Sequence, residues 1–142
     1  MVGVIITGHG QFAQGIYSSL TMIAGHQEDV EVVTFDGTDT EETLSNNLLT
    51  AISVLNHCEG IVIMCDLLGG SPFKAAATLS IENPKIHVIY GVNLGMLLEF
   101  SLTRLYVDNL EESLNKLLLS GQKSIGKYQF KPIEQETIED GI

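Results

Sequence analysis

Four short, mostly apolar runs constrain the fold of this chain more than any other feature. They cover residues 2–7, 30–35, 60–65 and 86–90, are rich in β-branched side chains, and are bounded by turn-forming residues. A strand with one face in water alternates apolar and polar residues, whereas these runs indicate burial on both faces. That pattern is typical of a parallel sheet covered by helices on both sides. We therefore expect these runs to be four strands of a mostly parallel sheet.

Apolar residues recur at helical spacing between these runs. The expected helices cover roughly residues 13–23, with Gly25 just past the end, then 39–55, 71–81, 94–104 and 109–120. Capping signals mark four of the starts: Thr38 with Glu41, Ser71 with Pro72, Asn93, and Asp108 with Glu111. Strands and helices thus alternate, which predicts a doubly wound α/β fold.

A weaker fifth strand is expected over Ser124–Phe130. This segment carries Gly126 and Lys127, and charged residues of this kind are common on edge strands. Gly121 is expected to end the preceding helix. The fold class predicted from the sequence is therefore α/β, with a mostly parallel sheet of four strands and a C-terminal antiparallel edge strand.

Composition limits the class of protein. The chain has 142 residues, 44% of them hydrophobic, which suits one globular domain with an ordinary core. We expect a domain over residues 1–130 and a mobile tail over residues 131–142, which hold four acidic groups. The net charge of −11 argues against nucleic acid and anionic membrane surfaces as partners.

The location of the protein is also predicted from what the sequence lacks. No apolar run is long enough to cross a bilayer, and no signal peptide is evident, so we expect a cytoplasmic protein. Cys58 and Cys65 lie on or beside an expected strand. In a reducing compartment they are most simply buried small hydrophobic residues, and a disulfide or metal pair is the minor interpretation.

Two polar side chains follow the first and third apolar runs. Thr7-Gly8-His9-Gly10 ends the first run, and Asp66 follows the third. Ligands of open α/β sheets bind beyond the carboxyl ends of the strands, and the first and third strands are usually adjacent. An aspartate that accepts a hydrogen bond from imidazole Nδ1–H fixes the tautomer and leaves Nε2 free to attack.

The residues after Asp66 suit an anion. Gly69, Gly70 and Ser71 form a small-residue loop at an expected helix N-terminus. Backbone N–H groups, the Ser71 hydroxyl and the helix dipole would bind a phosphoryl group there. No pair of histidines has metal-ligand spacing, and no tight acidic cluster suits magnesium, so we expect no metal and no small-molecule cofactor.

Each of these residues also has a simple structural interpretation. His9 could be a solvated residue after a strand, Asp66 could cap a loop, and Ser71-Pro72 is an ordinary helix start. Three other functions share parts of the pattern. These are a receiver-like signalling domain phosphorylated on Asp66, a hydrolase that uses Ser71 with His9, and a nucleotide- or flavin-binding module. The combination at adjacent strand ends favours a reaction site centred on the imidazole.

The same residues give the chain a family resemblance. It resembles the IIA domain of the mannose family of the sugar phosphotransferase system over roughly residues 1–130. Three matching pieces occur in the family's order: Gly8-His9-Gly10 with Phe12-Ala13 and Gly15, Asp66 with Gly69-Gly70-Ser71-Pro72-Phe73, and Gly91-Val92-Asn93 with Met96-Leu97.

The resemblance implies a phosphocarrier. His9 would accept a phosphoryl group from the phosphocarrier protein HPr and pass it to a separate IIB protein, with the membrane IIC and IID subunits served only indirectly. Asp66 would correspond to the family's histidine-orienting carboxylate, and Ser71 to its phosphoryl-binding hydroxyl. The resemblance also implies a homodimer in which the C-terminal strand, here Ser124–Phe130, crosses to the partner's sheet.

Overall fold

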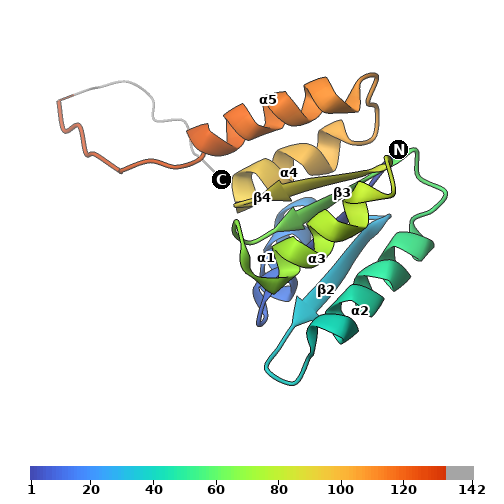
Figure 1. The fold of residues 1–142 in the computed structure, drawn as a ribbon. Helices are drawn as coiled ribbons and strands as arrows, with labels where there is room; N and C mark the ends of the chain where they lie inside the picture. The colour runs from blue at the N-terminus through green and yellow to red at the C-terminus, as the bar shows by residue number, and fades with distance from the viewer. Residues whose placement is uncertain (134–142) are drawn as a thin grey trace.

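Four parallel strands form the sheet at the centre of the fold (Figure 1). The structure is a computed structural model and describes residues 1–133. The strands lie in the order β2-β1-β3-β4. Their bounds are β1 (Val2–His9), β2 (Val30–Phe35), β3 (Gly60–Cys65) and β4 (Ile86–Tyr90). The four strands expected from the apolar runs are confirmed, and the first extends two residues further, through His9.

Five helices within the described residues cover the two faces of this sheet (Figure 1). Their bounds are α1 (Phe12–Ala24), α2 (Glu41–Val54), α3 (Gly70–Ile81), α4 (Leu94–Thr103) and α5 (Leu110–Lys123). One hydrophobic cluster joins the sheet to α1, α4 and α5, and a second joins it to α2 and α3. The doubly wound α/β fold is therefore confirmed. None of these helices combines the length and apolar character needed to cross a bilayer.

The central strand β1 shows why the apolar runs are continuous. Val4 and Ile6 belong to the cluster under α1 and α4, whereas Ile5 belongs to the cluster under α2. Successive side chains of a strand point to opposite faces, so a strand with helices on both sides needs apolar residues at every position. All three side chains are at most 2% exposed.

The start of α2 differs from the expectation. Thr38 was expected to cap this helix, but its hydroxyl donates to Asp36 Oδ1 at 2.7 Å and so belongs to the preceding turn. Thr40 is the N-cap instead, and its hydroxyl oxygen accepts the N–H of Thr43 at 3.0 Å. The prediction was wrong by two residues because an aspartate in the turn competes for the threonine hydroxyl.

Both ends of α5 also differ from the expectation. Asn109, not Asp108, caps the helix and accepts the N–H of Glu112 at 3.0 Å. Gly121 does not end the helix, because α5 continues to Lys123. A Cβ at Gly121 would lie 3.0 Å from Met96 Sδ, so the missing side chain serves the close packing of α5 on α4.

The expected fifth strand, Ser124–Phe130, does not form within the part of the chain that the structure describes. Residues 125–130 carry no sheet pairing and extend away from the body of the fold (Figure 1). Ile125, Tyr128 and Phe130 are between 67% and 83% exposed. The fifth strand is therefore absent from the sheet of the described chain, and its exchange in a dimer stays a prediction. Most of the expected acidic tail lies outside the described residues.

Two adjacent leucines of α2 provide a test of the packing. Leu48 is fully buried in the hydrophobic cluster between α2, α3 and the sheet, whereas Leu49 is 49% exposed. We expect Leu48→Ala to lower the free energy of unfolding by about 2–5 kcal/mol, because it removes buried methyl groups and leaves a cavity. The control Leu49→Ala should cost less than about 1 kcal/mol. Urea denaturation measures both, and equal losses would contradict the described core.

Candidate functional site

His9 and Asp66 come together at the carboxyl ends of two neighbouring strands. His9 is the last residue of β1, and Asp66 directly follows the last residue of β3. The two strands pair in parallel with Thr7 opposite Cys65, so they end at the same edge of the sheet. The sequence-based expectation that these strands are adjacent is confirmed.

The Asp66 carboxylate holds His9 at two points. Oδ2 accepts the backbone N–H of His9 at 2.9 Å and lies 2.8 Å from His9 Nδ1. Oδ1 accepts the backbone N–H of Leu67 at 2.9 Å. The Asp66 side chain is only 11% exposed, whereas that of His9 is 47% exposed. The carboxylate is thus fixed by its own loop and strand, and the imidazole it orients stays open to solvent.

The charge state of Asp66 determines the histidine tautomer. Burial raises the pKa of Asp66, but hydrogen bonds from the backbone and ring of His9 and from Leu67 outweigh it, so the pKa lies below its usual value. An ionised carboxylate only accepts hydrogen bonds, so Nδ1 of a neutral His9 ring carries the proton. The lone pair is therefore on Nε2.

Gly8 permits the close approach of the carboxylate. A Cβ at this position would lie 2.9 Å from Asp66 Cγ and 2.9 Å from a ring carbon of Phe12. Either distance is shorter than a real Cβ contact. A side chain here would push the carboxylate away from the histidine, so the glycine before His9 is a requirement of the pair.

Nε2 of His9 lies beside the start of α3. A Cβ at Gly70 would lie 3.0 Å from Nε2, and the φ of +77° at Gly70 also favours glycine. Gly69, also at positive φ, is the N-cap of α3, two residues before the expected cap Ser71. The first N–H groups of a helix have no partner within it and attract anions. An anion on Nε2 would therefore meet these N–H groups.

The Ser71 hydroxyl is bound to a residue, Glu41, that the sequence did not place near it. Its hydroxyl donates to Glu41 Oε1 at 3.0 Å and forms no hydrogen bond with His9. Glu41 is the first residue of α2, which packs beside α3 on the same face of the sheet. Only the tertiary packing of the two helices brings these residues together.

Aromatic and apolar side chains border the imidazole. The edge of the Phe35 ring meets the His9 ring with the two centroids 6.2 Å apart and the planes at 73°. Leu67 and Leu68, in the loop after Asp66, are 48% and 60% exposed. Exposed apolar residues beside a polar site are typical of surfaces that bind another protein.

The thiol of Cys65, the residue before Asp66, is buried and not available as a nucleophile. Cys65 is fully buried and free. Burial and the neighbouring Asp66 carboxylate raise the pKa of its thiol to about 12, so it is protonated at neutral pH. The expectation that both cysteines are buried is confirmed by the exposures of 0% for Cys65 and 3% for Cys58.

Fold and site together define a doubly wound α/β protein with a carboxylate-oriented histidine at its strand ends. The family model described as "PTS system fructose IIA component" matches residues 3–118. The chain therefore belongs to the EIIA family and is an EIIA component of the mannose family of the phosphotransferase system. EIIA components of this system are phosphotransferase components.

Individual relatives agree with the family. The fructose-specific EIIA component of Bacillus subtilis is 30% identical over 147 aligned positions, which cover all of both chains. The mannose-specific EIIAB component of Escherichia coli is 28% identical over 94% of this chain, and the match spans 42% of that longer protein. The crystal structure of an EIIA component from Streptococcus agalactiae superposes with a TM-score of 0.82 at 34% identity, covering 89% of this chain and 97% of that one.

The receiver-like alternative is not favoured. Both oxygens of Asp66 accept hydrogen bonds from His9 or Leu67. Within residues 1–133, the geometry of a possible metal site occurs at Asp29, His57 and Cys58 and not around Asp66. The hydrolase alternative loses its support as well, because the Ser71 hydroxyl bonds to Glu41 and not to His9.

The tautomer of His9 can be measured directly. We expect ¹⁵N NMR of the neutral His9 ring to show a proton on Nδ1 and a lone pair on Nε2, because the ionised Asp66 accepts from Nδ1. Asp66→Ala should shift His9 toward the mixture found in an unrestrained imidazole. His26, which is exposed, is the internal control and should not change. A His9 ring protonated on Nε2 in the unsubstituted protein would contradict the described geometry.

Proposed function

We propose that this protein carries a phosphoryl group on Nε2 of His9, accepting it from phosphorylated HPr and passing it to a IIB protein. The observation that supports this most strongly is the 2.8 Å contact between His9 Nδ1 and Asp66, because it leaves Nε2 of the neutral ring unprotonated on a side chain that is 47% exposed. An unprotonated ring nitrogen open to solvent is a nucleophile that a second protein can reach.

The transfer balances without a metal or an added proton. The lone pair of Nε2 attacks phosphorus in line, the N–P bond on the donor histidine breaks, and the electron pair of that bond returns to the donor imidazole. Nδ1 keeps its proton, so the His9 ring gains positive charge. The Asp66 carboxylate, already hydrogen-bonded to Nδ1, stabilises that charge. The step to a IIB protein is the reverse of this reaction with a different partner.

The start of α3 stabilises the transferred group. Backbone N–H groups of Gly70 and Ser71, together with the helix dipole, would bind the phosphoryl oxygens beside Nε2. The Ser71 hydroxyl would turn from Glu41 to the phosphoryl group, because two acceptors cannot share its single proton. Catalysis then consists of positioning and charge stabilisation by groups already in place.

The partners follow from the same proposal. HPr and the IIB protein would dock in turn on the exposed surface around His9, Leu67 and Leu68, and the membrane IIC and IID subunits would be served only indirectly. Both reactions would take place in the cytoplasm.

We further propose a homodimer in which the exposed residues 124–130 add a strand to the partner's sheet. The relatives are described as specific for fructose, mannose or sorbose, and the sugar itself would never touch this chain.

Phosphorylation of purified protein tests the carrier role. With phosphoenolpyruvate, enzyme I and HPr, we expect one phosphate per chain, in an acid-labile and base-stable linkage. His9→Ala should incorporate none, Asp66→Asn should react about 10-fold more slowly or worse, and His26→Ala should behave as the unsubstituted protein. Label retained in His9→Ala, or a base-labile acyl phosphate on Asp66, would exclude the proposed carrier.

A pair of variants tests the role of Ser71. We expect Ser71→Ala to slow phosphoryl transfer by about 10²-fold, because it removes a donor to the developing phosphoryl charge. Glu41→Ala breaks the same Ser71–Glu41 hydrogen bond but leaves the serine hydroxyl in place, so transfer should not slow. Rapid-quench rates distinguish the two. Equal slowing in both variants would mean that Ser71 matters only through its bond to Glu41.

A further inference from the structure

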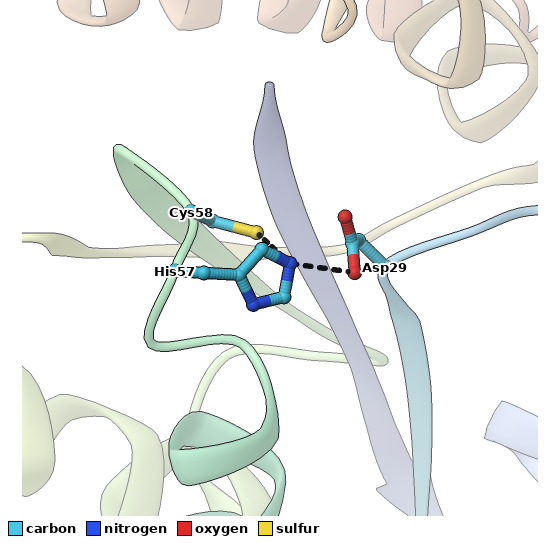
Figure 2. Close-up of side chains that lie close together, drawn as sticks. All are labelled: Asp29, His57 and Cys58. Atoms are coloured by element: carbon cyan, nitrogen blue, oxygen red, sulfur yellow. Dashed lines mark hydrogen bonds and ion pairs between the residues drawn. The ribbon is translucent and has the colours of Figure 1, made fainter.

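Three potential metal ligands meet at the end of the sheet opposite His9. Asp29 immediately precedes β2, and His57 and Cys58 lie in the connection that leads into β3. In Figure 2 the imidazole of His57 lies between the thiol of Cys58 and the carboxylate of Asp29, and the same ring nitrogen faces both groups. None of the three has a role in the proposed phosphoryl transfer.

The distances between the ligand atoms are close to those of a tetrahedral metal site. His57 Nε2 lies 3.0 Å from Asp29 Oδ1 and 3.8 Å from Cys58 Sγ, and all three ligand atoms lie within 4.8 Å of one another. With zinc–ligand bonds of about 2.0–2.3 Å, the edges of a tetrahedron are about 3.3–3.8 Å long. Small movements of the exposed imidazole and of the partly exposed Asp29 side chain would bring the three atoms to the distances of one tetrahedral site.

The backbone fixes two of these ligands before any ion binds. Asp29 has a φ of +57°, and its carbonyl accepts the N–H of Val4 at 3.0 Å, which holds it against β1. The guanidinium of Arg104 donates to the carbonyl of Glu28 at 2.6 Å and secures the preceding residue. Cys58 is only 3% exposed and donates its N–H to the carbonyl of Leu55 at 2.9 Å. The ligands are therefore largely pre-positioned.

Burial and charge favour a divalent ion with one open coordination position. The Cys58 thiol is buried, the Asp29 side chain is 23% exposed, and the His57 side chain is 59% exposed, so an ion would enter from the histidine side. On binding, the thiol would release its proton to solvent. The thiolate and carboxylate together would then neutralise a divalent charge, which matters because the buried Arg104 already places a positive charge nearby.

We propose that Asp29, His57 and Cys58 bind a divalent transition-metal ion of the zinc type, with solvent in the fourth position. A thiolate with an imidazole selects such ions, whereas magnesium and calcium prefer oxygen ligands alone. The ion would link the start of β2 to the connection before β3, at the end of the sheet opposite His9. This site is independent of the proposed carrier function.

Cobalt provides a direct test, because a thiolate bound to Co²⁺ produces an intense charge-transfer absorption band. We expect tag-free protein to show this band with one equivalent of Co²⁺, and added Zn²⁺ to remove it. Cys65→Ser should retain the band and Cys58→Ser should lose it. Binding of Zn²⁺ by calorimetry should weaken at least about 10-fold in His57→Ala, whose exposed side chain can be removed without disturbing the core.

Two controls and one further ligand variant identify the site. His26→Ala removes another exposed histidine, and His9→Ala removes the ring of the proposed carrier site, so neither should change the charge-transfer band. Asp29→Asn should weaken Zn²⁺ binding and leave phosphorylation by HPr unchanged. No charge-transfer band, or a band that survives in Cys58→Ser, would overturn the proposal. The three side chains would then form only a His57–Asp29 ion pair beside a buried thiol.

Discussion

The parallel pairing of β1 with β3 is the constraint on which the site depends. It places His9 and Asp66, 57 residues apart in sequence, at one edge of the sheet within hydrogen-bond distance. Both faces of β1 are packed, so this register is costly to change. A shift of one residue would move Val4 and Ile6 to the face that now holds Ile5, and Ile5 to the face that now holds them. The geometry of the histidine therefore derives its precision from the packing of the core.

Two absent side chains complete the site. Gly8 leaves room for the Asp66 carboxylate, and Gly70 leaves room for the ring of His9 beside the start of α3. The same imidazole is thus approached closely on its Nδ1 side by a carboxylate and on its Nε2 side by a helix N-terminus. One side stabilises positive charge on the ring, and the other suits negative charge on whatever the ring holds.

Most of this arrangement is predictable from the sequence, and the exceptions have physical causes. The strands were predicted because burial on both faces imposes continuous apolar runs, and His9 and Asp66 were predicted because parallel strands end together. The sequence predicts Thr38 as the cap of α2, but Asp36 accepts the Thr38 hydroxyl and Thr40 caps the helix. It predicts that Gly121 ends α5, but the glycine lies within the helix, where its small size permits the contact with Met96. The Ser71–Glu41 bond and the Asp29–His57–Cys58 cluster depend on how separate elements pack, and no local pattern encodes them.

The two hydrogen bonds between Asp66 and His9 have a consequence for how partner proteins would distinguish the phosphorylated from the unphosphorylated form under the proposed function. The carboxylate holds both the main chain and the ring of the histidine, and its second oxygen holds the following loop. A group added to the outer nitrogen would thus leave the surrounding backbone where it is. The backbone around His9 would be nearly the same with and without the proposed phosphoryl group. A partner would then distinguish the two forms mainly by the negative charge of that group.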